Sequence, residues 1–190
     1  MAKTIDTSLL DKAIKFAVDA HKGAERRGKG FPYIIHPMEA TEIVSTMTSD
    51  QELLAAAMLH DCIEDTPVTY DQIKDEFGKR VADLVRSESD IVVENKTESE
   101  SLHEIKQAAI DRIANSSRDA KIVAMGDKLS NMRAINRDYK EIGDKLWDKF
   151  HVTDKSEHKW HYVGLLHSLD ELKDTFAYKE FEKLLKEVFD

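Results

Sequence analysis

The sequence predicts a compact, all-α bundle of about nine or ten helices. Apolar residues recur at helical spacing along most of the chain. The 190 residues include only 7 Gly and 3 Pro, the residues that most often interrupt helices. This length is enough for one core of ordinary size, and we find no internal repeat or interdomain linker. Residues 1–190 are therefore predicted to form a single domain.

Each predicted helix combines apolar residues at helical spacing with capping or breaking residues near its ends. The helices are expected over residues 8–22, 37–47, 51–61, 69–77, 80–86, 102–114, 119–135, 158–172 and 176–188. Pro37 suits the first turn of the second helix, Asp50 caps the third, and Gly78 ends the fourth. The third helix is expected to be central because residues 53–59 are nearly all apolar.

Two segments are predicted to lack regular structure. Residues 23–31 form a loop rich in glycine and positive charge, and an extended segment then leads to His36. Residues 87–101 are polar and acidic apart from the apolar trio 91–93. This second segment is either a mobile loop over a site or a surface excursion.

The composition limits the classes of partner. The formal net charge is −9 and the pI is about 5.4, which disfavours broad binding to nucleic acid or to an anionic membrane. Cys62 is the only cysteine, so no intrachain disulfide can form and a reducing compartment is expected. The start of the chain, residues 1–6, has no apolar signal-peptide core, and no stretch approaches the length of a membrane span. These observations predict a cytoplasmic protein.

The segment HDCIEDT, residues 60–66, carries the strongest chemical signal. In a helix His60 and Glu64 lie on one edge at i,i+4, with Asp61 and Asp65 beside them. A metal-ligand pair would then adjoin an acid/base pair, as activation of water by a metal requires. The alternatives are a buried structural histidine and a solvated or capping acidic helix end.

Two further residues extend this signal. His36 precedes a proline at a helix start, and Asp127 lies late in an apolar helical run. A buried carboxylate is costly unless it is paired or bound to a cation. The alternative for Asp127 is a salt bridge to Lys128 or Arg133. With His60 and Asp61, these residues offer a set of two imidazoles and two carboxylates for Mn²⁺, Fe²⁺ or Zn²⁺.

Three segments give the chain a family resemblance: FPYIIHP at 31–37, LHDCIEDT at 59–66 and DKLSNMR at 127–133. The chain resembles the HD-domain metal phosphohydrolases, and among them the RelA/SpoT hydrolase domains and the stand-alone small alarmone hydrolases. The resemblance covers roughly residues 10–137. The blocks around His36 and His60 are specific when they occur jointly and in this order.

The resemblance implies roles for the site residues. One Mn²⁺ would be held by His36, His60, Asp61 and Asp127. Glu64 and Asp65 would manage the attacking water and its proton. The nucleotide would be contacted by residues that match family positions or add charge nearby: Arg27, Lys29, Tyr33, Lys128 and Asn131. Gly28 and Lys29 depart from the usual family pattern after the arginine, which affects substrate contacts and leaves the metal set intact.

A polyanionic substrate fits the local charge. Lys22, Arg26, Arg27 and Lys29 precede His36 in an otherwise acidic chain, and such a patch can hold phosphates. The alternative is a solvated basic loop. The resemblance implies removal of the 3′-pyrophosphate of guanosine tetra- or pentaphosphate. The alternatives are hydrolysis of another nucleotide, such as NADPH or a nucleoside monophosphate, and a catalytically silent nucleotide sensor.

The C-terminal third contains aromatic and imidazole groups near residues 147–162. The spacing of His158 and His161 could suggest a second metal, but no acidic partner accompanies it. Packing around Trp160 is favoured, with an aromatic wall for the nucleotide base as the alternative. Cys62 is expected to be a small buried residue and not a nucleophile.

Overall fold

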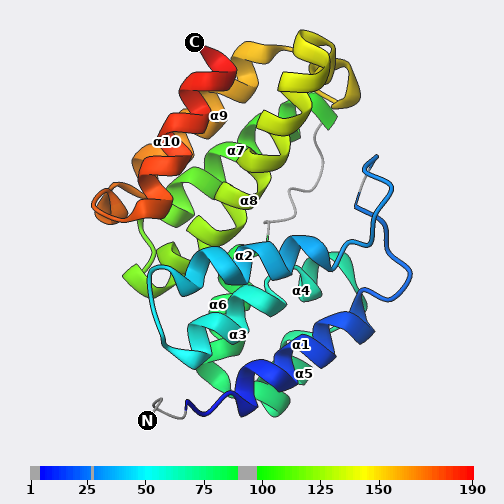
Figure 1. Cartoon of the computed structure of the whole chain (residues 1–190), viewed down its shortest axis with the longest axis vertical. Helices are drawn as coiled ribbons and strands as arrows, with labels where there is room; N and C mark the ends of the chain where they lie inside the picture. Colours follow the sequence, from blue (N-terminus) through cyan, green and yellow to red (C-terminus); the bar gives the residue numbers. More distant parts are fainter. Residues whose placement is uncertain (1–4, 27, 90–97) are drawn as a thin grey trace. The chain divides into compact units, whose positions relative to one another are not determined.

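The computed structural model of the chain describes residues 5–26, 28–89 and 98–190, with the backbone alone for 98–101. Over these residues it contains ten α-helices and two short 3₁₀ helices (Figure 1). The β-type pairing in the same residues is one isolated bridge between Glu25 and Pro32. The predicted all-α fold class is therefore confirmed. No helix within the described residues is both long enough and apolar enough to cross a membrane.

The chain forms two compact units, each described here by itself. The first unit comprises Met1–Ser89 and Ile122–Asp127, and the second comprises Asp90–Lys121 and Lys128–Asp190. The prediction of a single domain over residues 1–190 stays a prediction.

The first unit is built from six helices and a short part of a seventh. They are α1 (Ser8–Ala20), α2 (Ile35–Ser45), α3 (Gln51–Leu59), α4 (Cys62–Asp65), α5 (Tyr70–Phe77), α6 (Lys79–Glu88) and residues 122–127 of α8 (Arg118–Ile142). The central helix is α3, which packs against α1, α2 and α6. All residues from Leu53 to Leu59 are buried, as their apolar run predicted.

Local signals explain the ends of these helices. The Asp50 carboxylate accepts a hydrogen bond from the backbone N–H of Glu52 at 2.9 Å and caps α3. Thr69 and Gln72 form a reciprocal capping box at the start of α5. Gly78 has a φ of +88° and separates α5 from α6. This left-handed conformation is open to glycine and strained for most other residues. The predicted cap at Asp50 and the predicted end at Gly78 are both confirmed.

The second unit consists of longer helices. They are α7 (Glu98–Ala114), most of α8, the 3₁₀ helix Gly143–Lys149, α9 (Lys155–Ser168), the 3₁₀ helix Asp170–Leu172 and α10 (Phe176–Phe189). Helix α9 packs against both α7 and α10. The Trp147 ring stacks on His158 at 4.9 Å and on Phe189 at 5.4 Å between ring centroids.

Several boundaries differ from the prediction. The third helix ends at Leu59 and not at residue 61, and α8 continues to Ile142. The segment before His36 is a turn and not an extended strand, since Ile34 has helical φ and ψ of −52° and −23°. Of the segment 87–101, the first residues end α6 and residues 98–101 begin α7. Its central part, 90–97, lies outside the described residues.

Candidate metal centre

Four predicted ligands converge in the first unit. His36 lies in the first turn of α2, His60 and Asp61 connect α3 to α4, and Asp127 ends the part of α8 that belongs to this unit. His36, His60 and Asp127 are buried, and each offers a ligand atom within 4.8 Å of the others. We call these four residues the candidate metal centre.

The distances between the ligand atoms fit a shared cation. His60 Nε2 lies 2.9 Å from Asp61 Oδ2, 3.3 Å from His36 Nε2 and 3.7 Å from Asp127 Oδ1. His36 Nε2 lies 3.1 Å from Asp127 Oδ1 and 3.4 Å from Asp61 Oδ2. Atoms bound to one cation at about 2.1 Å are themselves roughly 3.0–3.4 Å apart when adjacent bonds meet at octahedral or tetrahedral angles. Four of the five separations lie close to this range, and the fifth, from His60 Nε2 to Asp127 Oδ1, is wider at 3.7 Å.

The backbone of α3 fixes the tautomer of His60. The ring atom Nδ1 lies 2.8 Å from the backbone carbonyl oxygen of Ala57. A carbonyl only accepts hydrogen bonds, so Nδ1 carries the proton and donates it. In the neutral ring the lone pair is then on Nε2, the atom that faces His36, Asp61 and Asp127, whereas the protonated ring carries a hydrogen on that atom. A histidine held in this way by a second hydrogen bond is the usual arrangement at metal sites.

A helix break allows His60 and Asp61 to face the same point. Adjacent side chains of a regular helix point in different directions and do not face each other. Here α3 ends at Leu59 and α4 begins at Cys62, and Asp61 has φ and ψ of −91° and −2°. After the break, the backbone N–H of Asp65 donates to the Asp61 carbonyl at 2.9 Å. These two residues therefore keep the i,i+4 relation of a helix.

The electrostatics of the centre favour positive charge. Burial of the His60 ring opposes its protonation, but Asp61 and Asp127 outweigh burial and raise the pKa of His60 well above its ordinary value. Burial also opposes ionisation of Asp61, yet the charge and hydrogen bond of His60 hold its pKa at about 2. The buried carboxylate of Asp127 and the half-buried carboxylate of Asp61 therefore need a compensating positive charge, which a divalent metal would supply.

A comparison with known families agrees with this geometry. A family model described as HD domain matches residues 13–150. The chain belongs to the HD domain family.

Relatives of this HD domain protein act on nucleotides, as their names state. It is 33% identical over 134 residues to the guanosine-3′,5′-bis(diphosphate) 3′-pyrophosphohydrolase MESH1 of Danio rerio, which covers 69% of this chain and 71% of that protein. It is 33% identical over 138 residues to the putative GTP diphosphokinase RSH1 of Arabidopsis thaliana, covering 68% of this chain. The chain spans only 16% of the length of that plant relative.

A solved structure shows the same fold as this HD domain protein. It is described as a metazoan ortholog of SpoT that hydrolyzes ppGpp and plays a role in starvation responses. The two chains align with a TM-score of 0.72 and 23% sequence identity, over 97% of each chain.

The two predicted acid/base residues of the HD domain lie at its surface. Glu64 and Asp65 belong to α4, directly after Asp61, and both are exposed. Cys62 between them and the centre is buried, and burial, followed by the charges of Asp61 and Asp65, raises the pKa of its thiol to about 12. A thiol with so high a pKa is almost fully protonated at neutral pH, in agreement with the prediction that Cys62 is not a nucleophile.

The predicted substrate contacts of the HD domain lie in several places. Tyr33 lies in the first unit, where its hydroxyl donates to Asp61 Oδ2 at 2.6 Å. Lys29 is half-buried in the loop before α2. Lys128 and Asn131 follow Asp127 along α8, in the second unit. Arg27 lies outside the described residues.

Arg133, one of the two alternative partners predicted for Asp127, forms an ion pair with Glu180. Its guanidinium donates twice to the Glu180 carboxylate, from Nε and Nη2, at 2.8 Å each. Both residues belong to the second unit. The carboxylate of Glu180 is therefore a bidentate ion-pair partner of Arg133.

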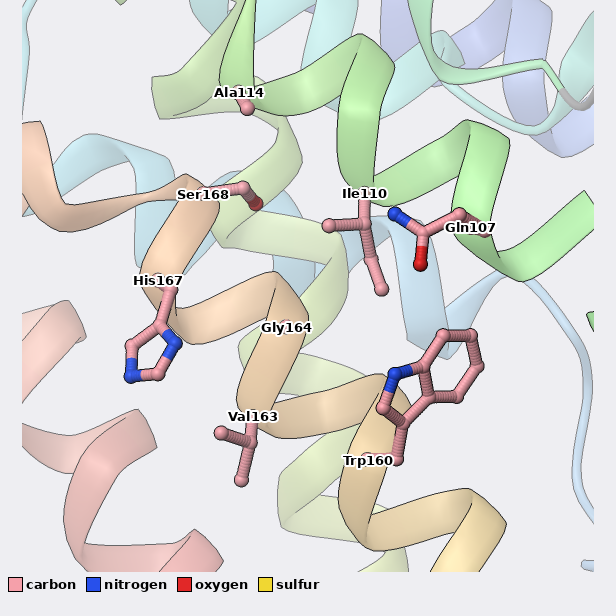
Figure 2. A pocket seen from close by; sticks show the side chains of 8 residues that line it. All are labelled: Gln107, Ile110, Ala114, Trp160, Val163, Gly164, His167 and Ser168. Carbon is pink, nitrogen blue, oxygen red and sulfur yellow. The ribbon is translucent and has the colours of Figure 1, made fainter.

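The second unit contains a separate pocket of about 470 Å³ between α7 and α9 (Figure 2). Figure 2 shows Ile110 of α7 pointing at Gly164 of α9, with Trp160 and Gln107 at one side. The residues that line it are Gln107, Ile110, Ala114, Trp160, Val163, Gly164, His167 and Ser168. None of them is a carboxylate, so this pocket lacks the acidic ligands of the candidate metal centre.

The C-terminal histidines take part in packing. His158 donates from Nε2 to the backbone carbonyl of Val152 at 2.7 Å, and its ring stacks on Trp147. Burial, with Lys106 and Lys128 nearby, lowers the pKa of His161 to about 3. Among the residues that the structure describes, no group close enough to hold a metal includes either histidine.

Two residues of the first unit were missed by the sequence-based prediction. His21 follows α1, is buried, and its ring lies against the Tyr33 ring at a tilt of 32°. Its place four residues after the buried Ala17 was the available signal. Gly126 was treated as part of an apolar run, although a glycine inside a helix is costly and indicates close packing.

Gly126 allows α8 to approach α2 closely. A Cβ at this position would lie 2.7 Å from the carbonyl oxygen of Ala40 and 2.7 Å from Val44 Cγ2. The backbone of Ala40 cannot move without shifting α2, which carries His36. The absent side chain thus permits Asp127, the next residue, to reach the His36 ring.

Replacing Gly126 with Ala is expected to lower the free energy of unfolding by about 1–3 kcal/mol through overpacking. The gain in helix propensity, about 1 kcal/mol, offsets part of this. Chemical denaturation followed by circular dichroism measures the change. The matched control is Gly164→Ala, where the nearest atom is the terminal methyl Cδ1 of Ile110 and not backbone. If the free energy of unfolding of Gly126→Ala equalled or exceeded that of wild type, α8 would be able to move away from α2 without a cost in stability.

Proposed function

We propose that this chain is a metal-dependent pyrophosphohydrolase that removes the 3′-pyrophosphate of guanosine tetra- or pentaphosphate. The observation that carries the proposal is the convergence of His36, His60, Asp61 and Asp127 at separations of 2.9–3.7 Å. The named activity of the Danio rerio relative supports the choice of substrate, because the aligned region covers 71% of that protein.

We propose Mn²⁺ as the cation. Two imidazole nitrogens and two carboxylate oxygens form a mixed set that suits Mn²⁺, Fe²⁺ or Zn²⁺ better than Mg²⁺ or Ca²⁺, which prefer all-oxygen ligands. When bound, the cation would polarise the phosphoryl group and lower the pKa of water. Fixed orientation of His60 by Ala57 reduces the reorganisation that cation binding costs.

Glu64 and Asp65 are proposed to orient the attacking water and to move its proton. The water oxygen forms a bond to the phosphorus that carries the ribose 3′ oxygen, and the bond between that phosphorus and the 3′ oxygen breaks. One carboxylate accepts the proton of the water, and the 3′ oxygen takes a proton as it leaves. The products are GDP or GTP and pyrophosphate. Both carboxylates are exposed on α4, where substrate and solvent have access.

Positive and polar residues are proposed to bind the nucleotide. Lys29, Lys128 and Arg27 would balance phosphate charge, and Asn131 would contact the nucleotide. The loop that holds Lys29 is closed by backbone hydrogen bonds, among them Arg26 N–H to the Phe31 carbonyl at 3.0 Å. A closed loop presents its cations at lower entropic cost than a free one.

The purified chain is expected to release pyrophosphate from guanosine tetraphosphate in the presence of Mn²⁺ and to lose this activity after treatment with EDTA. Removing the cation takes away charge compensation at Asp61 and Asp127 and the activation of water. Product identification by ion-exchange chromatography, together with metal analysis, measures both effects. Restoring the rate by added Mn²⁺ is the control against loss of the fold.

A nucleotide panel separates the competing functions. Turnover of NADPH or a nucleoside monophosphate without turnover of the alarmone would contradict the proposed substrate and leave phosphohydrolase chemistry in place. Binding of the alarmone without any product would indicate a nucleotide sensor.

A further inference from the structure

Tyr33 interacts with the candidate metal centre and not only with the loop that carries it. Its hydroxyl donates to Asp61 Oδ2 at 2.6 Å. The same oxygen lies 2.9 Å from His60 Nε2 and 3.4 Å from His36 Nε2. The Asp61 oxygen that points into the centre therefore accepts a hydrogen bond from the Tyr33 hydroxyl. A carboxylate oxygen has a second lone pair and can accept this bond while it faces a cation.

Asp65 also interacts with the Tyr33 hydroxyl. An ionised carboxylate can only accept a hydrogen bond, so the Tyr33 hydroxyl acts as the donor in its contact with Asp61. Tyr33 thus interacts with a proposed metal ligand, Asp61, and with a proposed acid/base residue, Asp65. Its hydroxyl has one hydrogen and can donate a hydrogen bond to only one of them at a time.

Contacts on several sides fix the orientation of the Tyr33 ring. The His21 ring lies against it with centroids 4.9 Å apart, and the Arg26 guanidinium lies 5.4 Å from its centroid. The edge of the His36 ring is in contact from a third direction, at 5.9 Å between centroids. The backbone N–H of Tyr33 donates to the Ala24 carbonyl at 2.9 Å. Such a ring has few alternative rotamers, so its hydroxyl is held at Asp61 before any ligand binds.

We propose that Tyr33 is a positioning residue whose hydroxyl holds Asp61 Oδ2 toward His36 and His60 and so sets the affinity of the centre for its cation. This inference rests on the proposed function. It replaces the role of substrate contact that the family resemblance implied for Tyr33, because a hydroxyl that donates to Asp61 does not offer its proton to a phosphate.

The Tyr33→Phe variant tests this role, since it keeps the ring against His21 and removes only the hydroxyl. We expect its affinity for Mn²⁺, measured by titration calorimetry on the metal-depleted chain, to fall by about 10- to 100-fold, as for other residues that orient metal ligands. At saturating Mn²⁺ the KM for the nucleotide should stay within about twofold of wild type while kcat falls. A substrate contact predicts the opposite, an unchanged Mn²⁺ affinity and a raised KM.

The matched control is Tyr70→Phe. The Tyr70 hydroxyl also donates to a carboxylate of the first unit, Asp83 Oδ1 at 2.8 Å, but Asp83 has no part in the centre. Its Mn²⁺ affinity should equal that of wild type. A second variant, His21→Gln, keeps the Tyr33 hydroxyl but removes the ring that lies against Tyr33, and should weaken Mn²⁺ binding by a smaller factor. It keeps the inference testable if Tyr33→Phe fails to fold.

The outcomes separate this inference from the proposed function. Wild-type Mn²⁺ affinity in both Tyr33→Phe and His21→Gln would overturn the positioning role, whatever the substrate. Weakened Mn²⁺ binding in Tyr33→Phe, in a chain that releases no pyrophosphate from the alarmone, would support the positioning role and contradict the proposed substrate.

Discussion

Replacing Asp127 with Asn is expected to abolish stable binding of a divalent cation and to lower the rate of pyrophosphate release by about 10³-fold or more. Asp127 Oδ1 lies 3.1 Å from His36 Nε2 and is one of two carboxylates in the candidate metal centre. The amide keeps the shape of the side chain but removes the charge that a cation needs. Lewis-acid activation supplies several kcal/mol, and each 1.36 kcal/mol is a factor of ten in rate.

Metal analysis after dialysis against Mn²⁺, combined with a pyrophosphate-release assay, measures both effects of Asp127→Asn. The control is Asp83→Asn, which removes a carboxylate of the same unit that pairs with the exposed Lys79 and accepts from Tyr70. It should keep the metal content and the rate of wild type. A wild-type metal content in Asp127→Asn would show that His36, His60 and Asp61 suffice and that the centre has been assigned one ligand too many.

The second large effect is expected at Glu64 and Asp65. The variants Glu64→Gln and Asp65→Asn should each lower kcat by about 10²- to 10⁴-fold, the range of general acid–base catalysis, with an unchanged content of Mn²⁺. Both side chains are exposed on α4 and neither is required to hold the cation in the proposed arrangement. Steady-state kinetics at saturating Mn²⁺ measure kcat, and metal analysis verifies the loading.

The comparison variant for this pair is Asp71→Asn, which removes an exposed acidic charge from α5 of the same unit. Its kcat should equal that of wild type, because a general change in net charge does not alter proton transfer at the site. If Glu64→Gln and Asp65→Asn both retained full kcat, the acidic pair would be a solvated helix end and the proton would move by another route.

The residues of the candidate metal centre could be singled out from the sequence because their residue types conflict with their surroundings. An Asp at the end of the apolar run 122–126 has few explanations other than a charge partner. The seven buried residues of α3 likewise identified the central helix, since an unbroken apolar run cannot face water. In both cases the information is local and lies in the identity of neighbouring residues.

Geometry that depends on tertiary contact was not predictable. The end of α3 was placed at residue 61 and not at Leu59, and the short helix α4 was not predicted, because Leu59 to Asp65 has no Gly or Pro to mark a boundary. The end of α8 was placed too early because the apolar pattern fades after residue 135. The helix continues to Ile142 through long charged residues that favour helix, and Lys140 is supported by an ion pair with Glu187 at 2.8 Å.

The order of the ligands along the chain has a consequence for folding. Residues 36 and 127 meet at one point, while residues 90–121 of the intervening chain belong to the second unit. A cation at this point would therefore act as a reversible cross-link that closes a long loop and disfavours the unfolded ensemble. Its binding free energy would add to the stability of the native state in proportion to the logarithm of its concentration. Metal supply would then govern the lifetime of the folded chain as well as its chemistry.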